Sequence, residues 1–567
     1  MAESSPPLLA SWLPRLALPS VIVVGLACGL IGIDWGLPSA RRVALLGESV
    51  NKVRDELSAR TARELGVRDR HAAMLTMQPA EEDLDLPRLV RRYLLFTDSP
   101  DEGLTLLGLA NFKPRQLDFN PRMVEYGGLH VYGVGAAMTL AHLLGFGRIC
   151  GEGVHYADHP QDIARLYIAG RVLMVLYNIG IAVLLFFFGR EIAAGAPRSL
   201  CGWSAALLWL LSPLSLSFSH FVNPHLPAGF YGTLAAWLAW RAGASGSRRA
   251  WFGAAAAGGA ATACALNTIV TLFAPFLIAA LGLHASMRAA KEFTVPNYLA
   301  QLARPVGLAV LVAGAFYLAF NPYFFANLDV LREELAGYRQ VREPAVGLLG
   351  PLFYVAGALP STLGLVGVAT AVFGAARLWR ESAARGRAMA TYAAVGLVFT
   401  AWLMGSEAGQ AHTVRFATFL VPLLCVFIAA ALTGSWPRLA RAVVAGLIGL
   451  GAICAAGVYL TSFTRTSRDD AGEFICREVP AGSAIGAPRS PGPYEMPAFD
   501  FSRLRLVSDP RAPRDYVVQV EERAAPSPPA GFELMQSFPA SGVHPPTPLS
   551  FSGRFVRLYR RAGGGGG

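Results

Sequence analysis

Long apolar runs separated by short polar turns dominate the pattern of the chain. A helix needs about 20 apolar residues to cross a bilayer, and eleven runs approach or reach that length. No A-x-A-like cleavage site follows the first run, so it reads as a retained helix rather than a signal peptide. The pattern predicts an all-α polytopic membrane protein with about eleven transmembrane helices, near residues 16–36, 166–188, 201–220, 227–240, 250–266, 268–284, 305–321, 360–376, 388–405, 416–433 and 442–461.

Two large polar parts interrupt this pattern, residues 37–165 after the first run and residues 462–567 at the end. The second part contains many prolines and short strand-like runs, which predict a small β-rich or α/β domain. These runs lie at 503–507, 516–520 and 555–559, and Gly563–Gly567 reads as a flexible tail. The expected division is a membrane domain, 1–461, and a C-terminal domain, 462–567.

Basic residues gather in alternate loops, which predicts the orientation in the membrane. With the N-terminus in the cytoplasm, the turns near 221–226, 266–268 and 406–414 face outward and carry no Lys or Arg. Residues 37–165 and the C-terminal domain then lie outside as well. The short inner loops carry 14 basic residues: Arg190, Arg198, Arg241, Arg248, Arg249, Arg288, Lys291, Arg304, Arg377, Arg380, Arg385, Arg387, Arg438 and Arg441.

A twelfth apolar run lies at 129–147, inside the first outer part. Counting it as a span would invert every later loop and place the basic residues outside. It also contains His130, Tyr132 and His142, which suit an interface better than a lipid-facing span. The run therefore predicts a helix lying at the outer surface of the membrane.

Composition excludes the other protein classes. Of the 567 residues, 53% are hydrophobic and 15% are charged, with a mean hydropathy of +0.42. A soluble domain has about 25% charged residues, and a disordered chain is poor in apolar ones. The net charge of +11 follows the inner loops, so it indicates topology rather than nucleic-acid binding. Only Lys52, Lys113 and Lys291 are lysines. This preference for Arg over Lys is typical of a GC-rich bacterial genome.

Acids outside the inner loops are the candidate chemical groups, because carboxylates near a membrane are costly. Asp34 lies at the outer end of the first span, in I-D-W-G-L-P. It is either a functional acid or an acid that only caps or ends its helix. Asp101 and Glu102 follow a proline in D-S-P-D-E-G at 98–103, which predicts the start of a helix. From spacing alone they could also be a solvated N-terminal pair. Glu125 precedes a Gly-Gly break in the polar segment before the interfacial helix.

Taken together, D-W-G-L-P, P-D-E and N-P-x(3)-E-Y-G-G-L-H-V-Y resemble the first outer loop of the C-type (GT-C) membrane glycosyltransferases. The nearest branch is the bacterial part of the dolichyl-phosphate-mannose protein mannosyltransferase superfamily, with the aminoarabinose transferases of lipid A. The ordered set extends over about residues 30–460. Its later segments are A-R-L-Y-I-A-G-R at 164–171, L-S-P-L-S-L-S-F-S-H-F-V-N-P-H-L-P at 211–227, N-P-Y-F at 321–324 and V-R-F-A-T-F-L-V-P at 414–422.

The resemblance implies transfer of a sugar from a polyprenyl-phosphate donor to a lipid, glycan or protein acceptor at the outer face of a bacterial inner membrane. It assigns Asp101 as general base, with Glu102 assisting and Asp34 supporting the loop. The residues expected to bind substrate are Glu125, Tyr126, His130, Asn223, His225 and Arg415, the last through the donor phosphate. No P-loop or G-x-G-x-x-G motif is present for a nucleotide, and a divalent metal is left open as a cofactor.

Three features depart from the family pattern. His225 stands in N-P-H-L-P where relatives usually carry an acid, and A-L-N-T at 265–268 stands where they often carry a lysine. The charged stretch between Pro38 and Pro100 predicts an additional helical hairpin outside the membrane.

Two other functional classes stay open. A transporter or flippase of lipid-linked intermediates would carry charged residues inside several spans, whereas here Arg171 is the main exception. A non-catalytic subunit of the same fold is the other alternative, because His225 cannot supply the charge of the usual acid.

Overall fold

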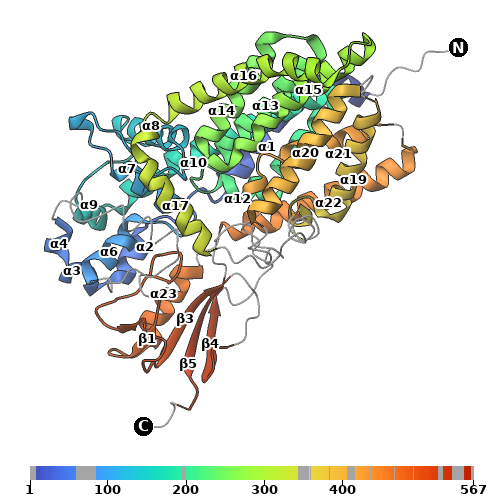
Figure 1. Ribbon diagram of the computed structural model, residues 1–567. Coiled ribbons are helices and arrows are strands. Elements are labelled where there is room, and N and C mark those ends of the chain that lie inside the picture. The colour runs from blue at the N-terminus through green and yellow to red at the C-terminus, as the bar shows by residue number, and fades with distance from the viewer. Residues whose placement is uncertain are drawn as a thin grey trace.

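The computed structural model shows a helical bundle with a small sheet at one end (Figure 1). It describes residues 8–58, 85–193, 198–341, 357, 359–381, 383–404, 415–434, 436–464, 467–488, 491–521, 528–538 and 555–563. The expected outer turn at 406–414 and most of the glycine tail lie outside the described residues.

Helices occupy every one of the eleven predicted spans, which confirms the all-α membrane part. They are α1 (Leu8–Leu30), α10 (Pro160–Ile192), α11 (Arg198–Leu210), α12 (Pro213–Ser219), α13 (His225–Ser245), α14 (Arg248–Cys264), η3 (Leu266–Leu272), α15 (Phe273–Ala289), α16 (Val295–Phe320), α19 (Leu359–Glu381), α20 (Ala383–Met404), α21 (Val421–Leu432) and α22 (Arg438–Ser462).

The number of membrane crossings is not settled by helix length and composition. In the described part of the chain, five helices are long and apolar enough to cross a membrane. A sixth is added if α11 and α12, bent by 58° at their junction, form one span. The bend follows from Pro213, which cannot continue the backbone hydrogen bonding of a helix. The predicted count of eleven therefore stays a prediction.

Small residues let the central helices approach closely, as is typical of helix packing in membranes. An ideal Cβ on Gly202 of α11 would lie 2.1 Å from the carbonyl oxygen of Phe186 in α10. Large side chains such as Trp209 and Trp240 fill the space further along the bundle and are fully buried or nearly so. By contrast α22 exposes Leu439 and other leucines along one face, as expected of a helix that borders lipid.

The first outer part is mainly helical. Its helices are α2 (Ala40–Leu46), α3 (Glu48–Lys52), α4 (Arg54–Ser58), α6 (Leu86–Leu95), α7 (Pro100–Ala110), η2 (Pro114–Gln116), α8 (Gly128–Leu143) and α9 (Gly153–Asp158). α2 to α6 lie where the additional helical hairpin was expected, although residues 59–84 are outside the described ones. α8 occupies the run predicted as interfacial and exposes Leu140, Leu143 and Leu144 at its end. Its position at the membrane surface stays a prediction.

The C-terminal domain confirms the expected small sheet. α23 (Ser467–Glu478) precedes β1 (Ala484–Gly486), β2 (Arg505–Val507), β3 (Tyr516–Glu521), β4 (Phe532–Phe538) and β5 (Phe555–Arg561). The strand order is β2-β1-β3-β5-β4, parallel from β2 to β3 and antiparallel from β3 to β4. The predicted runs correspond to β2, β3 and β5. β1 has three residues and β4 contains an irregularity between Leu534 and Gln536, so neither gives a regular alternating pattern.

The C-terminal domain and the first outer part share one hydrophobic core. Leu46 of α2 and Val90 and Leu94 of α6 are buried in the same cluster as Phe499 and Leu558 of the C-terminal domain. The sheet thus stands beside α2, α3 and α6 (Figure 1). The last hundred residues therefore support the loop that leads into α7.

Candidate active site

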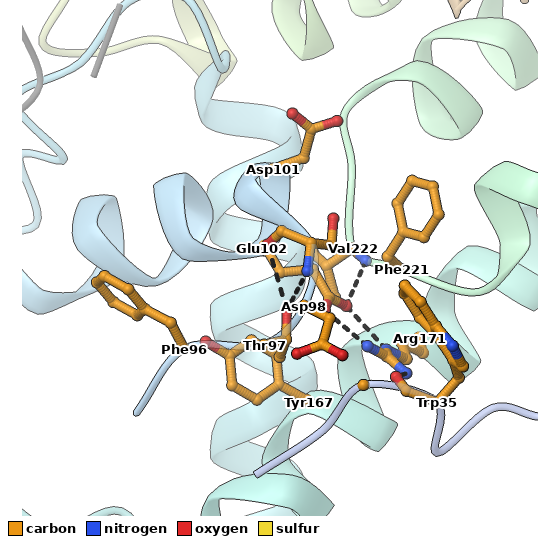
Figure 2. A network of polar contacts seen from close by, with 12 residues as sticks. Trp35, Phe96, Thr97, Asp98, Asp101, Glu102, Tyr167, Arg171, Phe221 and Val222 are labelled. Carbon is orange, nitrogen blue, oxygen red and sulfur yellow. Dashed lines mark hydrogen bonds and ion pairs between the residues drawn. The ribbon is translucent and has the colours of Figure 1, made fainter. Parts of the chain in front are cut away.

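α7 places two adjacent acids at its first turn. Pro100 occupies the first helical position, where its missing N–H costs nothing, and the positive end of the helix dipole favours carboxylates there. Asp101 and Glu102 are 7% and 0% exposed, so they are not the solvated pair that spacing alone allowed. Neighbouring residues on a helix point about 100° apart, and the two acids have different surroundings (Figure 2).

Glu102 lies at the centre of a buried hydrogen-bond network (Figure 2). Arg171 of α10 donates to both carboxylate oxygens, from Nε to Oε1 at 2.8 Å and from Nη2 to Oε2 at 2.7 Å. The Thr97 hydroxyl donates to Oε2 at 2.6 Å and the Val222 N–H to Oε1 at 2.8 Å. Both members of the ion pair have fully buried side chains. Glu102 therefore holds α7, α10 and the turn before α13 together.

Arg171 extends this network to the D-W-G-L-P segment. Its Nη1 donates to the carbonyl oxygens of Ile33 and Trp35, both at 2.7 Å. Asp34 lies between these two residues and is itself exposed. Asp34 thus lies at the edge of the network. The backbone carbonyl groups of its two neighbours, and not its own carboxylate, make the contacts with Arg171 that hold this loop.

Asp101 points away from the network of Glu102 (Figure 2). Its Oδ1 lies 3.4 Å from Nη1 of Arg415, which precedes α21. The guanidinium stacks over Phe416, 4.9 Å from the ring centroid, and the Phe416 ring lies 5.5 Å from that of His225. Burial raises the pKa of Tyr126 well above its ordinary value, and the negative charge of Asp101 adds to the rise. Tyr126 therefore stays protonated beside the carboxylate.

His130 of α8 is the neutral member of the site. Its Nε2 lies 3.1 Å from Oγ1 of Thr105, one turn after Asp101 on α7. The residue is 2% exposed, and burial lowers its pKa to about 3, so the ring is uncharged at neutral pH. Within the described part of the chain, Nδ1 is a buried ring nitrogen with no hydrogen-bond partner. Buried polar atoms are rarely left without a partner.

Asn223 shapes the turn that carries His225. Its Oδ1 accepts from the N–H groups of His225 and Leu226 at 3.0 and 3.3 Å. Its Nδ2 donates to the carbonyl oxygens of Phe218 and Phe221, both at 2.7 Å. The amide of Asn223 is thus engaged with the backbone, and His225 stands buried at the start of α13.

The Gly-Gly break lies wedged between the ends of two membrane helices. The Gly127 N–H donates to the carbonyl oxygen of Cys264 at the end of α14, at 2.9 Å. The Gly128 N–H donates to Oδ1 of Asn321, just after α16, at 2.7 Å. These contacts fix the segment that carries Glu125 and Tyr126.

Alanine at either glycine is expected to destabilise the protein. An ideal Cβ would lie 2.0 Å from the carbonyl oxygen of Ala263 at Gly127, and 2.1 Å from that of Phe320 at Gly128. Backbone must then move, at a cost of about 1–3 kcal/mol or more. Gly133→Ala is the control, because the nearest atom to its Cβ is a side-chain carbon of Leu173 at 3.8 Å. Thermal unfolding in detergent measures the difference, and equal midpoints for Gly127→Ala and Gly133→Ala would contradict it.

Most of the expected site residues come together. Asp101, Tyr126, His130, His225 and Arg415 form one cluster, described above. Glu125 lies on the same loop as Tyr126 but interacts with Glu334, and Asp34 and Glu102 lie in or beside the Arg171 network. The described residues contain no group of three or more His, Cys, Asp or Glu placed to hold a metal ion.

Sequence reasoning did not assign Arg171, Asp98 or Glu334 to the site. A signal existed for Arg171, because a lone arginine inside an apolar span needs a buried anion. Asp98 and Glu334 have partners far along the chain, and no local motif marks them.

The chain is similar to several solved membrane-protein structures. It has 14% identity to the apo oligosaccharyltransferase of Archaeoglobus fulgidus, with 81% of this chain and 70% of that chain covered and a TM-score of 0.41. It has 13% identity to ArnT from Cupriavidus metallidurans bound to undecaprenyl phosphate, with 79% and 87% covered and a TM-score of 0.40. For the apo state of ArnT the values are 13%, 78%, 86% and 0.42. No protein-family model and no curated protein matches the chain.

Proposed function

We propose that the protein is a membrane glycosyltransferase with Asp101 as its general base. The donor is a polyprenyl-phosphate sugar and the acceptor is a hydroxyl group of a lipid, glycan or protein. The observation that carries this proposal is the buried Asp101 carboxylate, 3.4 Å from the Arg415 guanidinium. A base for the acceptor and a cation for a phosphate leaving group thus stand side by side.

The reaction that suits these groups is a single displacement. The acceptor hydroxyl gives its proton to Asp101 while its oxygen forms a bond to the anomeric carbon of the sugar. The bond between that carbon and the phosphate oxygen breaks, and the polyprenyl phosphate leaves with the electron pair. One displacement inverts the configuration of the anomeric carbon. Asp101 acts as base and forms no bond to the sugar.

Arg415 couples donor binding to the release of the base. A guanidinium can bind two phosphate oxygens at once, with a geometry that Lys cannot match. When the donor phosphate takes the guanidinium, the Asp101 carboxylate loses its cationic neighbour and becomes available to the acceptor hydroxyl. The protonated Tyr126 and the neutral His130 surround this place without adding charge, so they suit hydrogen bonds to sugar hydroxyl groups.

The proposed setting follows from the distribution of basic residues. With the inner loops in the cytoplasm, α7 and the C-terminal domain lie on the periplasmic side of a bacterial inner membrane, with the N-terminus inside. A transporter would place charged groups along a path through the spans. The charge inside a span, Arg171, suits a structural role instead, because its side chain is fully buried and paired with Glu102.

Asp101→Asn is expected to lower sugar transfer roughly 100- to 10,000-fold, the usual effect of losing a general base. Membranes containing the full chain would receive a panel of radiolabelled polyprenyl-phosphate sugars, with endogenous acceptors present. Asp158→Asn is the control, because that acid forms an exposed ion pair with Arg54 and exposed pairs contribute little.

Equal transfer by Asp101→Asn and the wild type would overturn the role of Asp101. No transfer by the wild type from any donor, in membranes that a second glycosyltransferase can glycosylate, would favour the non-catalytic subunit. Arg415→Met should weaken retention of a polyprenyl phosphate in detergent, whereas Asp101→Asn should not.

A further inference from the structure

A segment after α16 fastens the outer loop that carries Tyr126. It comprises residues 321–336, which include η4 (Phe325–Asn327) and most of α17 (Leu328–Val341). We call this segment the clasp. Its hydrogen-bonded links to loop 118–128 include Phe119 N–H to the Tyr323 hydroxyl at 3.2 Å, the reciprocal amide pair of Asn120 and Asn327 at 3.0 and 2.8 Å, Val124 N–H to Glu334 Oε1 at 3.1 Å, and Gly128 N–H to Asn321 Oδ1 at 2.7 Å.

The clasp docks by its polar side chains. Of its residues only Asn327, at the end of η4, and Glu334, in α17, are buried. Phe325 and Leu335 are 67% and 47% exposed. An ordinary surface helix buries its apolar face. Because hydrogen bonds contribute only about 0.5–1.5 kcal/mol each in exchange with water, a clasp held in this way can open.

Glu334 carries a proton when the clasp is docked. Burial raises its pKa to about 8, and the charges of Glu125 on the loop and Glu333 on its own helix act in the same direction. The backbone N–H groups of Val124 and Glu125 oppose the rise without cancelling it. Tyr317 of α16 is a further titratable neighbour of Glu334. Glu334 is thus a neutral carboxyl at pH 7, facing a second carboxylate.

We propose that Glu334 is a positioning residue for the transfer reaction, which closes the clasp by taking up a proton and so holds Tyr126 against Asp101. The link from the clasp to the reaction rests on the proposed function, whereas the docking of the clasp does not. Glu334 touches no reacting group. It acts through the Val124 N–H, two residues before Tyr126.

The direction of the pH dependence follows from the two states. An open clasp exposes Glu334, which then titrates near its ordinary value of 4.5, whereas the docked residue titrates at about 8. Between these values docking takes up a proton, so rising pH weakens it by up to about tenfold per unit. Above about pH 8 both states are ionised and no further weakening is expected.

Hydrogen exchange of the full-length protein in detergent tests the docking. Peptides covering 118–128 would be followed from about pH 5 to pH 9, with rates corrected against the unfolded chain. In the wild type the protection should fall at least tenfold across the window. Glu334→Gln should keep its protection at every pH, because Gln can accept from Val124 and cannot ionise. Glu334→Ala should be poorly protected throughout. Glu333→Gln removes the smaller of the two charges that raise the pKa of Glu334, so it should keep the fall in protection, which should end at only slightly lower pH.

Activity provides the second readout. The alkaline fall in kcat should be present in the wild type and absent in Glu334→Gln, whereas Glu334→Ala should lower kcat more than it raises the KM for the donor. Protection that is independent of pH in the wild type would overturn the proposal, and this needs no variant to fold. pH-dependent protection in a preparation with no transfer activity would support the clasp and count against the proposed function alone.

Discussion

Glu102→Ala is expected to leave little folded protein in the membrane. The substitution would leave Arg171 of α10 without its carboxylate partner, although its side chain is fully buried. Breaking a buried pair by removing one partner costs about 3–5 kcal/mol, a large share of the stability of an ordinary domain. The Val222 N–H would lose its acceptor as well, and the Thr97 hydroxyl would lose the shorter of its two contacts. Folded yield and thermal unfolding in detergent measure the effect.

A matched pair and a double variant make this result specific. Glu191→Ala removes a partner from an ion pair with Arg241 that is largely exposed, and it should change the unfolding midpoint little. Glu102→Leu with Arg171→Met removes both charges, and replacing both partners by apolar groups is often tolerated. The double variant should therefore be less destabilised than the sum of its single variants. It should not reach the wild type, because the carbonyl oxygens of Ile33 and Trp35 lose their donor. Additive effects would contradict this account.

Asp98→Ala is expected to loosen the C-terminal domain from the first outer loop. Asp98 accepts from Arg42 of α2 at 2.7 Å and lies 3.4 Å from Arg468 of α23, and all three side chains are buried. Both arginines would lose this carboxylate, which costs about 3–5 kcal/mol for a buried pair. Asp469 also acts on Arg42 electrostatically, so we expect the low end of that range. Hydrogen exchange of α2 and α23 measures the loosening.

The same substitution is expected to reduce sugar transfer. Asp98 is three residues before Asp101, and its N–H is bonded to the carbonyl oxygen of Gly36 at 2.9 Å, so it sets the entry into α7. Asp470→Ala is the control on the other side of α23, because its pair with Arg41 is about half exposed. If Asp98→Ala and Asp470→Ala show the same hydrogen exchange in α2 and α23 and the same rate of sugar transfer, the buried contact does not couple the C-terminal domain to the site.

Local patterns explain why so much of the fold could be predicted. Spans, helix starts and strands depend on residues a few positions apart, so apolar length predicted the bundle helices and alternation predicted β2, β3 and β5. Pro100 with two acids predicted the start of α7 in the same way. The sequence alone thus determined the membrane class, the small sheet, and the polar part, residues 37–165, in which Asp101 and Tyr126 lie.

The tertiary structure alone decided which acid does what. Asp101 and Glu102 are adjacent and chemically alike in the sequence. Glu102 meets an arginine 69 residues away, and Asp98 one 370 residues away. Glu334 accepts a hydrogen bond from the N–H of Val124, which lies 210 residues away in the sequence. Such pairings depend on which helix ends pack together, and a low-dielectric interior then forces each buried charge to find a partner. No local pattern encodes that choice, so packing separated the structural acid from the one facing Arg415.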